Sequence, residues 1–267
     1  MRIARFAAGD EVSYGLVGTA RPGSTAGGGE VIAELAGHPF GGSEGIRLTG
    51  TAYPLTDVRL LAPVLPSKVI GYGAAVPGPA GRAEDGLDEG SVMYLKPSTT
   101  VCGPSDAIRY PAQAHRLEPE GKLAVIIGRL CRQVPPDQAA AVIFGYACAL
   151  DVTAADVAAR DGQWARAKGF DTFCPLGPWI ETDAGAGDVT LVTSVNGQVR
   201  RRAGLPRAGQ DVAALVAAAS SVMTLLPGDV LLAGGAGGAA GELDYGDEVS
   251  VSIDGVGTLT NKVEKGD

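Results

Sequence analysis

Histidine, the residue most often used for acid–base and metal chemistry, is nearly missing from this chain. Only His38 and His115 occur among 267 residues, and neither belongs to an H-E-x-x-H run. No P-loop and no G-x-S-x-G elbow occurs either, which argues against a phosphate cradle and a serine nucleophile. We expect His38 to be a turn residue.

Cysteine and positive charge are also in short supply. The four cysteines have spacings that fit neither a zinc site nor a disulfide framework. We therefore expect reduced thiols, with Cys131 and Cys148 buried as small apolar side chains. A net charge of −8 leaves no basic face for a phosphate backbone, which argues against nucleic acid as a partner.

Long apolar runs are missing as well. No stretch approaches the roughly 18 residues that a membrane span requires, and the first residues have no signal-peptide core. We expect a cytoplasmic protein that does not bind membranes.

Glycine and proline, in contrast, are abundant. Forty glycines and 17 prolines predict short strands and frequent turns, so that sheet dominates the fold. Apolar stretches alternate with Gly, Ser and Pro clusters over residues 1–66, which predicts a small β domain followed by a larger domain over 67–267. Helical spacing predicts two helices, at 135–150 and 209–225.

The most informative segment is 162–179, GQWARAKGFDTFCPLGPW, an apolar run with a single lysine, Lys168. It closely resembles the KGFDTFCPLGPW signature of the fumarylacetoacetate hydrolase superfamily. Other segments follow that family in order and spacing: SKV at 67–69, YLKPSTTVCGPSDAI at 94–108, LAVIIGR at 123–129, GYACALDV at 145–152, MTLLPGDVLLAG at 223–234 and GDEVSVSIDGVGTLTNKV at 246–263.

The resemblance implies a fold and a type of chemistry. The fold is mixed β with some α: a small amino-terminal β domain, then a β-rich carboxy-terminal domain rolled around a central pocket, assembled as a homodimer. The chemistry is cleavage, decarboxylation or isomerisation of small β-dicarbonyl and enol acids at a divalent metal.

The metal ligands that the resemblance implies are incomplete. The family carries two glutamates in E-x-E-L-A and an aspartate in D-V-x-A-R-D; here these positions are Glu120, Lys122 and Asp151. Replacing Glu by Lys changes the formal charge by two units, the charge that a magnesium ion would supply. We expect an internal Glu120–Lys122–Asp151 cluster and no cofactor, with weak magnesium or manganese binding by Glu120 and Asp151 as the exception. Alternatively, Lys122 extends into solvent.

Other groups that the family uses are replaced. The R-N-Y-x-x-H segment, whose histidine acts as general base, aligns with Ala74, Ala75, Val76 and Pro79. The Arg and Gln of D-V-x-A-R-D-x-Q, which would stabilise an oxyanion, are Ala155 and Ala158. His115 precedes the strand of Glu120, so it lies either within reach of the pocket mouth or in a solvated loop.

The candidate site residues follow from the same comparison. We predict catalytic roles for Lys168, Lys122, Glu120 and Asp151. Lys96 is either a substrate contact or a structural lysine along a strand. The full set of predicted substrate contacts is Lys96, Tyr72, Tyr94, Thr172, Gly234 and Gly235.

Residues 74–90 combine proline, glycine and acidic side chains with little apolar content. Such a segment has little to pack, so we expect a loosely ordered loop in place of a lid helix. The pocket should then be open and, with Ala155, Ala158 and Gly235, wide enough for a substrate larger than a short keto acid.

Three functions remain open at this stage. The first is a metal-independent enzyme of specialised metabolism that acts on an enolisable β-dicarbonyl or ketide-like acid. For it, isomerisation, decarboxylation, dehydration or cyclisation is favoured over hydrolysis. The second is a non-catalytic binding or scaffold protein that keeps only the fold. The third is a carbon–carbon bond hydrolase of the fumarylacetoacetate or acylpyruvate type.

Overall fold

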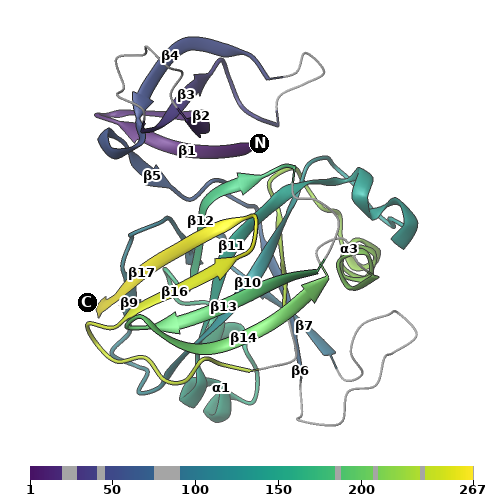
Figure 1. Ribbon diagram of the computed structural model, residues 1–267. Helices are drawn as coiled ribbons and strands as arrows, with labels where there is room; N and C mark the ends of the chain where they lie inside the picture. Colours follow the sequence, from purple (N-terminus) through teal and green to yellow (C-terminus); the bar gives the residue numbers. More distant parts are fainter. Residues whose placement is uncertain are drawn as a thin grey trace.

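The computed structural model describes residues 1–19, 29–40, 46–74, 91–183, 188–206, 210–234 and 238–266. Strands dominate it and helices are few, as the glycine and proline content predicts (Figure 1). The amino-terminal part consists of β1 (Arg2–Ala8), β2 (Glu11–Thr19), β3 (Glu30–Leu35), β4 (Leu48–Pro54), the 3₁₀ turn η1 (Leu55–Asp57) and β5 (Arg59–Leu61).

A large sheet runs through the molecule in the order β4-β3-β2-β1-β12-β11-β10-β15-β6-β7. Two further strands are attached to it, since β5 pairs with β1 and β8 pairs with β12. The strands not yet defined are β6 (Val69–Ala74), β7 (Ser91–Lys96), β8 (Val101–Cys102), β10 (Leu117–Ile127), β11 (Ile143–Ala154), β12 (Cys174–Glu181) and β15 (Val230–Ala233).

A second sheet has five strands in the order β14-β13-β16-β17-β9 and lies against β10 and β11 (Figure 1). Its strands are β9 (Ile108–Tyr110), β13 (Asp188–Val195), β14 (Gln198–Pro206), β16 (Glu248–Ile253) and β17 (Gly257–Lys265). The short helical elements are η2 (Ser98–Thr100), η3 (Pro136–Ala141), α1 (Ala155–Asp161), α2 (Ala165–Lys168) and α3 (Gln210–Val222).

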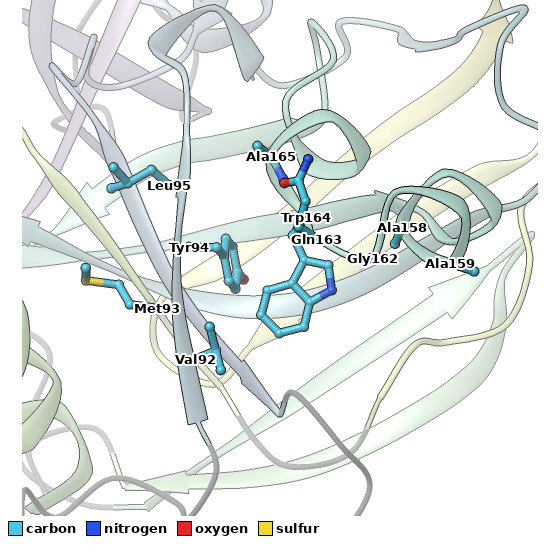
Figure 2. A pocket seen from close by; sticks show the side chains of 10 residues that line it. All are labelled: Val92, Met93, Tyr94, Leu95, Ala158, Ala159, Gly162, Gln163, Trp164 and Ala165. Atoms are coloured by element: carbon cyan, nitrogen blue, oxygen red, sulfur yellow. The ribbon is translucent and has the colours of Figure 1, made fainter.

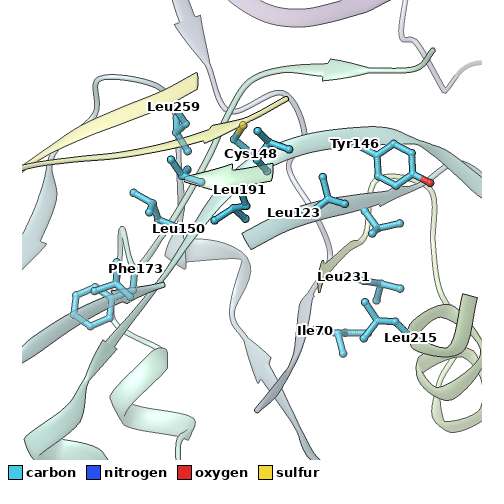
Figure 3. Packing of buried hydrophobic residues seen from close by; sticks show 14 of the residues in the cluster. Ile70, Leu123, Tyr146, Cys148, Leu150, Phe173, Leu191, Leu215, Leu231 and Leu259 are labelled. Atoms are coloured by element: carbon cyan, nitrogen blue, oxygen red, sulfur yellow. The ribbon is translucent and has the colours of Figure 1, made fainter. Parts of the chain in front are cut away.

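The main core lies between the two sheets. Successive side chains of a strand point to opposite faces, so alternate residues of β10 and β11, such as Leu123 and Leu150, face the second sheet. There they meet Leu191 and Leu259, and all four side chains are almost completely buried (Figure 3). The remaining residues of β10 and β11 face the other way, which is the side on which the candidate site lies.

One of the two predicted helices is wrong. Residues 135–150 form the 3₁₀ turn η3 and then most of β11, whereas the second prediction, 209–225, is confirmed as α3 (Gln210–Val222). β11 is central in the large sheet and buried on both faces, so it is apolar at every position over Tyr146–Leu150. A strand of this kind shows no alternation, and its sequence pattern cannot be distinguished from a buried helix.

The large sheet is strongly rolled. Four strand-to-strand steps separate β11 from β7, a distance of about 19 Å in a flat sheet. Nevertheless Lys96 of β7 contacts Asp151 of β11, with 2.7 Å between Nζ and Oδ1. The sheet therefore curls until β7 lies across from β11, which gives the rolled, pocket-forming domain that the sequence predicts.

The amino-terminal strands continue the same sheet through the pairing of β1 with β12. At the junction, the buried carboxylate of Asp229 accepts hydrogen bonds from the Ser67 amide and hydroxyl and pairs with the Lys68 ammonium at 2.5 Å. These contacts fix the start of β6 beside β15. The domain boundary at residue 66 stays a prediction.

Three expectations concern other features of the chain. Of the predicted loop at 74–90, only Ala74 belongs to the described residues, as the last residue of β6; residues 75–90 lie outside them. None of the described helices is both long and apolar enough to cross a membrane. All four cysteines are buried free thiols, as expected for Cys131 and Cys148.

Strand β6 needs glycine where it passes the Tyr94 ring. A Cβ atom at Gly71 would lie 2.2 Å from Cζ of Tyr94, closer than any real contact. The Gly71→Ala variant should displace that ring and lose about 1–3 kcal/mol of unfolding free energy, the usual cost of overpacking. Urea denaturation measures the loss.

Gly18→Ala is the matched control, because Gly18 lies in β2 and a Cβ there meets no atom within 4 Å. It should leave stability unchanged or raise it by up to about 1 kcal/mol, since Ala is stiffer than Gly in the unfolded chain. Equal stability of the two variants would contradict the packing described here.

Candidate active site

Strands β10 and β11 present charged residues on one face. Glu120 and Asp151 are directly opposite each other in the pairing of these strands. Because residues i and i+2 share a face, Lys122 lies on the face of Glu120, and Thr153 on the face of Asp151. The sheet thus collects three charged groups and a hydroxyl on the side turned toward β7.

Asp151 is the centre of this group and is completely buried. Its Oδ1 accepts a hydrogen bond from Lys96 Nζ at 2.7 Å. Its Oδ2 accepts one from Lys168 Nζ at 2.7 Å and another from the Tyr94 hydroxyl. One carboxylate therefore joins β7, β11 and α2.

The environment fixes the protonation of these groups. Burial alone would raise the pKa of Asp151, but the ammonium groups of Lys168, Lys96 and Lys122 hold this pKa well below its ordinary value. Burial lowers the pKa of Lys96, and the neighbouring Asp151 opposes that shift. Burial, followed by the charge of Asp151, raises the pKa of Tyr94 far above 10. Asp151 is thus an anion at neutral pH, and Tyr94 is a neutral donor.

Lys168, the lysine of the 162–179 segment, ends the short helix α2 and is only 5% exposed. Besides Asp151 it donates to the hydroxyl of Thr153 at 2.7 Å, and its Nζ lies 4.5 Å from the centre of the Tyr94 ring. Two of its three N–H donors thus have partners among the described residues.

Lys122 is also buried, with a side chain that is 5% exposed, so the expectation that it extends into solvent is wrong. Its Nζ lies 2.8 Å from Oε2 of Glu120 and donates to the carbonyl of Gly234 at 3.3 Å. The predicted cluster is therefore internal but divided. Lys122 pairs with Glu120, while Asp151 pairs with Lys96 and Lys168.

Three ammonium groups face two carboxylates in this cluster: Lys96, Lys122 and Lys168 against Glu120 and Asp151. The formal charge is +1. In the family pattern three carboxylates would face two lysines and a divalent ion, which also gives +1. The single change at residue 122 thus preserves the net charge without an ion.

Three of the predicted substrate contacts are placed elsewhere or are committed to other partners. Tyr72 pairs with Met93, one position out of step with Tyr94, so its side chain points to the opposite face of the sheet. The Thr172 hydroxyl accepts a hydrogen bond from the Arg109 amide at 2.8 Å. Lys96 is 1% exposed and bound to Asp151. Of the two roles left open for this residue, the structure favours the structural lysine over the substrate contact.

The two glycines have different outcomes. Gly234 contributes its carbonyl to Lys122, and a Cβ there would lie 3.0 Å from Cδ of that lysine. Gly235 lies outside the described residues.

Two further residues belong to the site but were not predicted. Thr153 binds Lys168, and its place two residues after Asp151 was the signal that would have identified it. Trp164 packs edge-on against Tyr94 with ring centres 5.5 Å apart. It was not predicted as a site residue, although it lies in the 162–179 segment that the sequence singled out.

The two histidines lie at the surface. His115 is exposed, and its backbone amide donates to Asp156. His38 is exposed between Tyr14 and Phe40.

A pocket of about 830 Å³ adjoins the cluster. The Tyr94 and Trp164 rings project into it from β7 and from the start of α2 (Figure 2). Its described lining is Val92, Met93, Tyr94, Leu95, Ala158, Ala159, Gly162, Gln163, Trp164 and Ala165. Tyr94 belongs to both sites, because its ring lines the pocket and its hydroxyl binds Asp151.

Comparison with known proteins agrees with this arrangement. The family of the fumarylacetoacetate hydrolase C-terminal domain matches residues 68–264, and a family named Rv2993c-like, N-terminal matches residues 1–63. The chain belongs to the fumarylacetoacetate hydrolase family. The predicted fold class is confirmed, and the chain belongs to a family of enzymes.

Relatives of this chain carry several names. Protein Rv2993c of Mycobacterium tuberculosis is 44% identical over 267 residues, which cover 98% of each chain. A crystal structure of 5-carboxymethyl-2-hydroxymuconate delta-isomerase from Mycobacterium smegmatis is 46% identical with a TM-score of 0.85, covering 99% of this chain and 100% of that one. Rat mitochondrial oxaloacetate tautomerase Fahd2a is 32% identical and covers 79% of this chain and 71% of its own length.

Metal binding occurs in the fumarylacetoacetate hydrolase family. The structure of maleylpyruvate hydrolase from Sphingobium sp. SYK-6, 28% identical with a TM-score of 0.73 over the whole of both chains, contains manganese and pyruvate. In the present chain the residues do not fit such an ion. Both oxygens of Asp151 already accept hydrogen bonds, and the ammonium of Lys122 lies beside Glu120. Among the described residues, no three His, Cys, Asp or Glu side chains converge.

A variant with a glutamate at position 122, which completes the family's set of carboxylates, should bind a divalent metal ion. Manganese should bind weakly or not at all to the natural chain in titration calorimetry, and the Lys122→Glu variant should bind it at least tenfold more tightly. Lys262→Glu makes the same charge change at an exposed position of β17 and is the control. If the unaltered protein bound manganese with micromolar affinity, the claim that its residues do not fit a metal ion would be wrong.

The Lys96–Asp151 pair should make a large contribution to stability. Removing one partner of a buried ion pair typically costs about 3–5 kcal/mol. Lys168 and Tyr94 still hold Asp151 in the Lys96→Met variant, so we expect about 3 kcal/mol. The exposed Lys262→Met should change the unfolding free energy by less than about 0.5 kcal/mol.

The same variant should alter the dependence of stability on pH. The pKa of Asp151 is depressed in the folded state, so its contribution is complete above the unfolded pKa of about 3.9 and is lost as pH falls below it. Lys96→Met weakens the depression. The two unfolded chains titrate alike, so the gap between the two proteins should stay constant near neutral pH and narrow only as the pH falls through the folded-state pKa of Asp151 in the variant. Urea unfolding from pH 7 to pH 2 measures this, and a gap that widens toward low pH would show that Lys96 does not act through Asp151.

Proposed function

We propose that this protein catalyses the keto–enol isomerisation of a small enolisable keto acid without a metal ion, with Lys122 and Glu120 as the reacting pair. The observation that carries this proposal is the buried Lys122 ammonium, 2.8 Å from the Glu120 carboxylate. The names of relatives support the reaction type, since two of them are called an isomerase and a tautomerase.

Enolisation places negative charge on an oxygen atom, and Lys122 can stabilise it. Its side chain is almost completely buried, so the charge acts in a medium of lower dielectric than water. At about 4 Å and an effective dielectric of about 20, an ammonium and an enolate attract by on the order of 4 kcal/mol before desolvation. Two of the three N–H donors are used by Glu120 and Gly234, which leaves one for the substrate.

Glu120 is suited to move the proton. Its side chain is 27% exposed, the most accessible of the five charged groups of the cluster. In the proposed step its carboxylate takes the proton from the carbon next to the carbonyl, while Lys122 donates a hydrogen bond to the oxygen. The proton then passes from Glu120 to the carbonyl oxygen, so that a C–H bond breaks, an O–H bond forms and the π bond moves from C=O to C=C; the reverse sequence gives the keto form.

Hydrolysis needs a further base that activates water. The positions of the family's histidine, arginine and glutamine carry Pro79, Ala155 and Ala158. Isomerisation needs only the cation and the carboxylate, so we prefer it. Decarboxylation of a β-keto acid produces the same kind of enolate, whereas dehydration and cyclisation start from it, and analysis of the product separates these reactions.

Lys168 enters the proposal as a second ammonium close to the reacting pair. It orients Asp151 and adds positive charge, and its Nζ lies 4.5 Å from the centre of the Tyr94 ring that lines the pocket. The substrate is the only partner the proposal requires. Homodimer formation, a cytoplasmic location and the absence of a cofactor stay predictions.

Turnover with a chelator present tests the proposal. The isomerisation of oxaloacetate from enol to keto form is monitored by the loss of enol absorbance. We expect this reaction to continue in excess EDTA. Removing one donor to a developing oxyanion costs about 10²–10³ in kcat, so Lys122→Met should lose at least about 100-fold. Glu120→Gln should also be impaired, and Lys262→Met should match the natural protein.

Two outcomes would oppose it. Activity that vanishes in EDTA and returns with manganese would replace the ammonium mechanism with a metal mechanism. No turnover of any enolisable keto acid, with a folded protein, would favour the non-catalytic alternative.

A further inference from the structure

The pocket beside the charged cluster has a lining unlike that of a polar acid site. Among its described lining residues none is charged, and the polar groups are the amide of Gln163 and the rings of Tyr94 and Trp164. Valine, methionine, leucine, alanine and glycine supply the rest. Sites with aromatic and aliphatic walls and few polar groups bind apolar ligand surfaces.

The pocket is also large for a small acid. Its volume of about 830 Å³ lies in the upper part of the range of about 300–1,000 Å³ that ligand pockets span. Small side chains create the space on the helix side, where Ala158 and Ala159 of α1 and Gly162 at its end line the pocket beside Trp164 (Figure 2). Ala158 stands where the family pattern has glutamine.

Nearby positive charges are already engaged. Lys96 and Lys168 bind Asp151, and Lys122 binds Glu120. Arg166 of α2 pairs with Asp161 at 2.7 Å. Arg160 of α1 is half exposed and lies 4.0 Å from Asp156 and Asp161. No described lining residue carries a positive charge, so a second carboxylate of a substrate would enter this pocket without a cation in its wall, and burying an unpaired charge is strongly unfavourable.

Tyr94 connects the pocket to the strands that carry the reacting pair. The inner wall of the pocket is Tyr94, whose hydroxyl donates to Asp151, and Asp151 is directly opposite Glu120 in the strand pairing. A substrate with its keto acid at Lys122 and Glu120 would thus direct its remaining substituent toward Tyr94 and Trp164.

We propose that this pocket binds a bulky apolar substituent, aryl or branched alkyl, of the substrate, so that the protein acts on a monocarboxylic enolisable keto acid in preference to a short dicarboxylate. The assignment to a substrate rests on the proposed function. The ligand chemistry of the pocket rests on its lining alone.

Binding tests the pocket without any reaction. Neither 3-phenylpropionate nor glutarate enolises readily, and both are measured by titration calorimetry against the natural protein. We expect 3-phenylpropionate to bind at least tenfold more tightly than glutarate. The Ala158→Phe variant, which fills the pocket, should raise the dissociation constant of 3-phenylpropionate at least tenfold.

A second variant covers the case in which the larger side chain disturbs the fold. Ala159 is exposed on α1, and arginine is nearly as good a helix former as alanine. Ala159→Arg supplies the missing cation at the rim and should tighten glutarate binding at least threefold. Equal binding of the two acids to the natural protein, or unchanged 3-phenylpropionate affinity in a folded Ala158→Phe, would overturn the proposal.

Turnover separates this inference from the proposed function. Phenylpyruvate should be isomerised with a higher kcat/KM than oxaloacetate, and Ala158→Phe should reverse that order. If neither acid is turned over while 3-phenylpropionate still binds in the stated order, the proposed function fails and the pocket stands. If oxaloacetate is preferred and glutarate binds more tightly, the pocket assignment fails and the isomerase proposal stands.

Discussion

The structure of the site depends on one buried carboxylate. Asp151 binds Lys96 from β7, Lys168 from α2 and the Tyr94 hydroxyl, and β7 lies four strands away from β11 in the sheet. An unpaired carboxylate at this depth would be strongly destabilising, so the sheet has to roll until these donors arrive. The roll in turn places Tyr94 between the charged cluster and the apolar pocket.

The chemistry depends on Lys122. A glutamate at this position would complete a set of oxygen ligands, whereas lysine pairs with Glu120 and occupies the space beside it. The formal charge of the cluster is unchanged, because one ammonium replaces a carboxylate together with a divalent ion. In the proposed function, the site keeps the field that stabilises an enolate and does without the ion that would deliver an activated water. On that proposal, this exchange links the family fold to isomerisation without metal.

The sequence predicted the sheet-rich fold from its glycine and proline content, and the resemblance to the family's E-x-E-L-A motif favoured an internal Lys122 over one that extends into solvent. The sequence wrongly predicted a helix where β11 lies. Both faces of this strand are buried, so its apolar residues do not alternate with polar ones. The sequence also could not show which of Tyr72 and Tyr94 lies at the site. These two differ by a single step of register in the β6–β7 pairing, and the roll that brings Lys96 to Asp151 is a long-range contact that no local pattern encodes.

The most direct measurement is a crystal structure with oxalate, a stable mimic of a planar enolate, grown in a chelator. Our account predicts an oxalate oxygen about 2.7–2.9 Å from Nζ of Lys122, the usual length of a charge-assisted hydrogen bond, with no ion between Glu120 and Asp151. Oxalate bound through a metal ion at those carboxylates, or bound away from an unchanged Lys122–Glu120 pair, would contradict it.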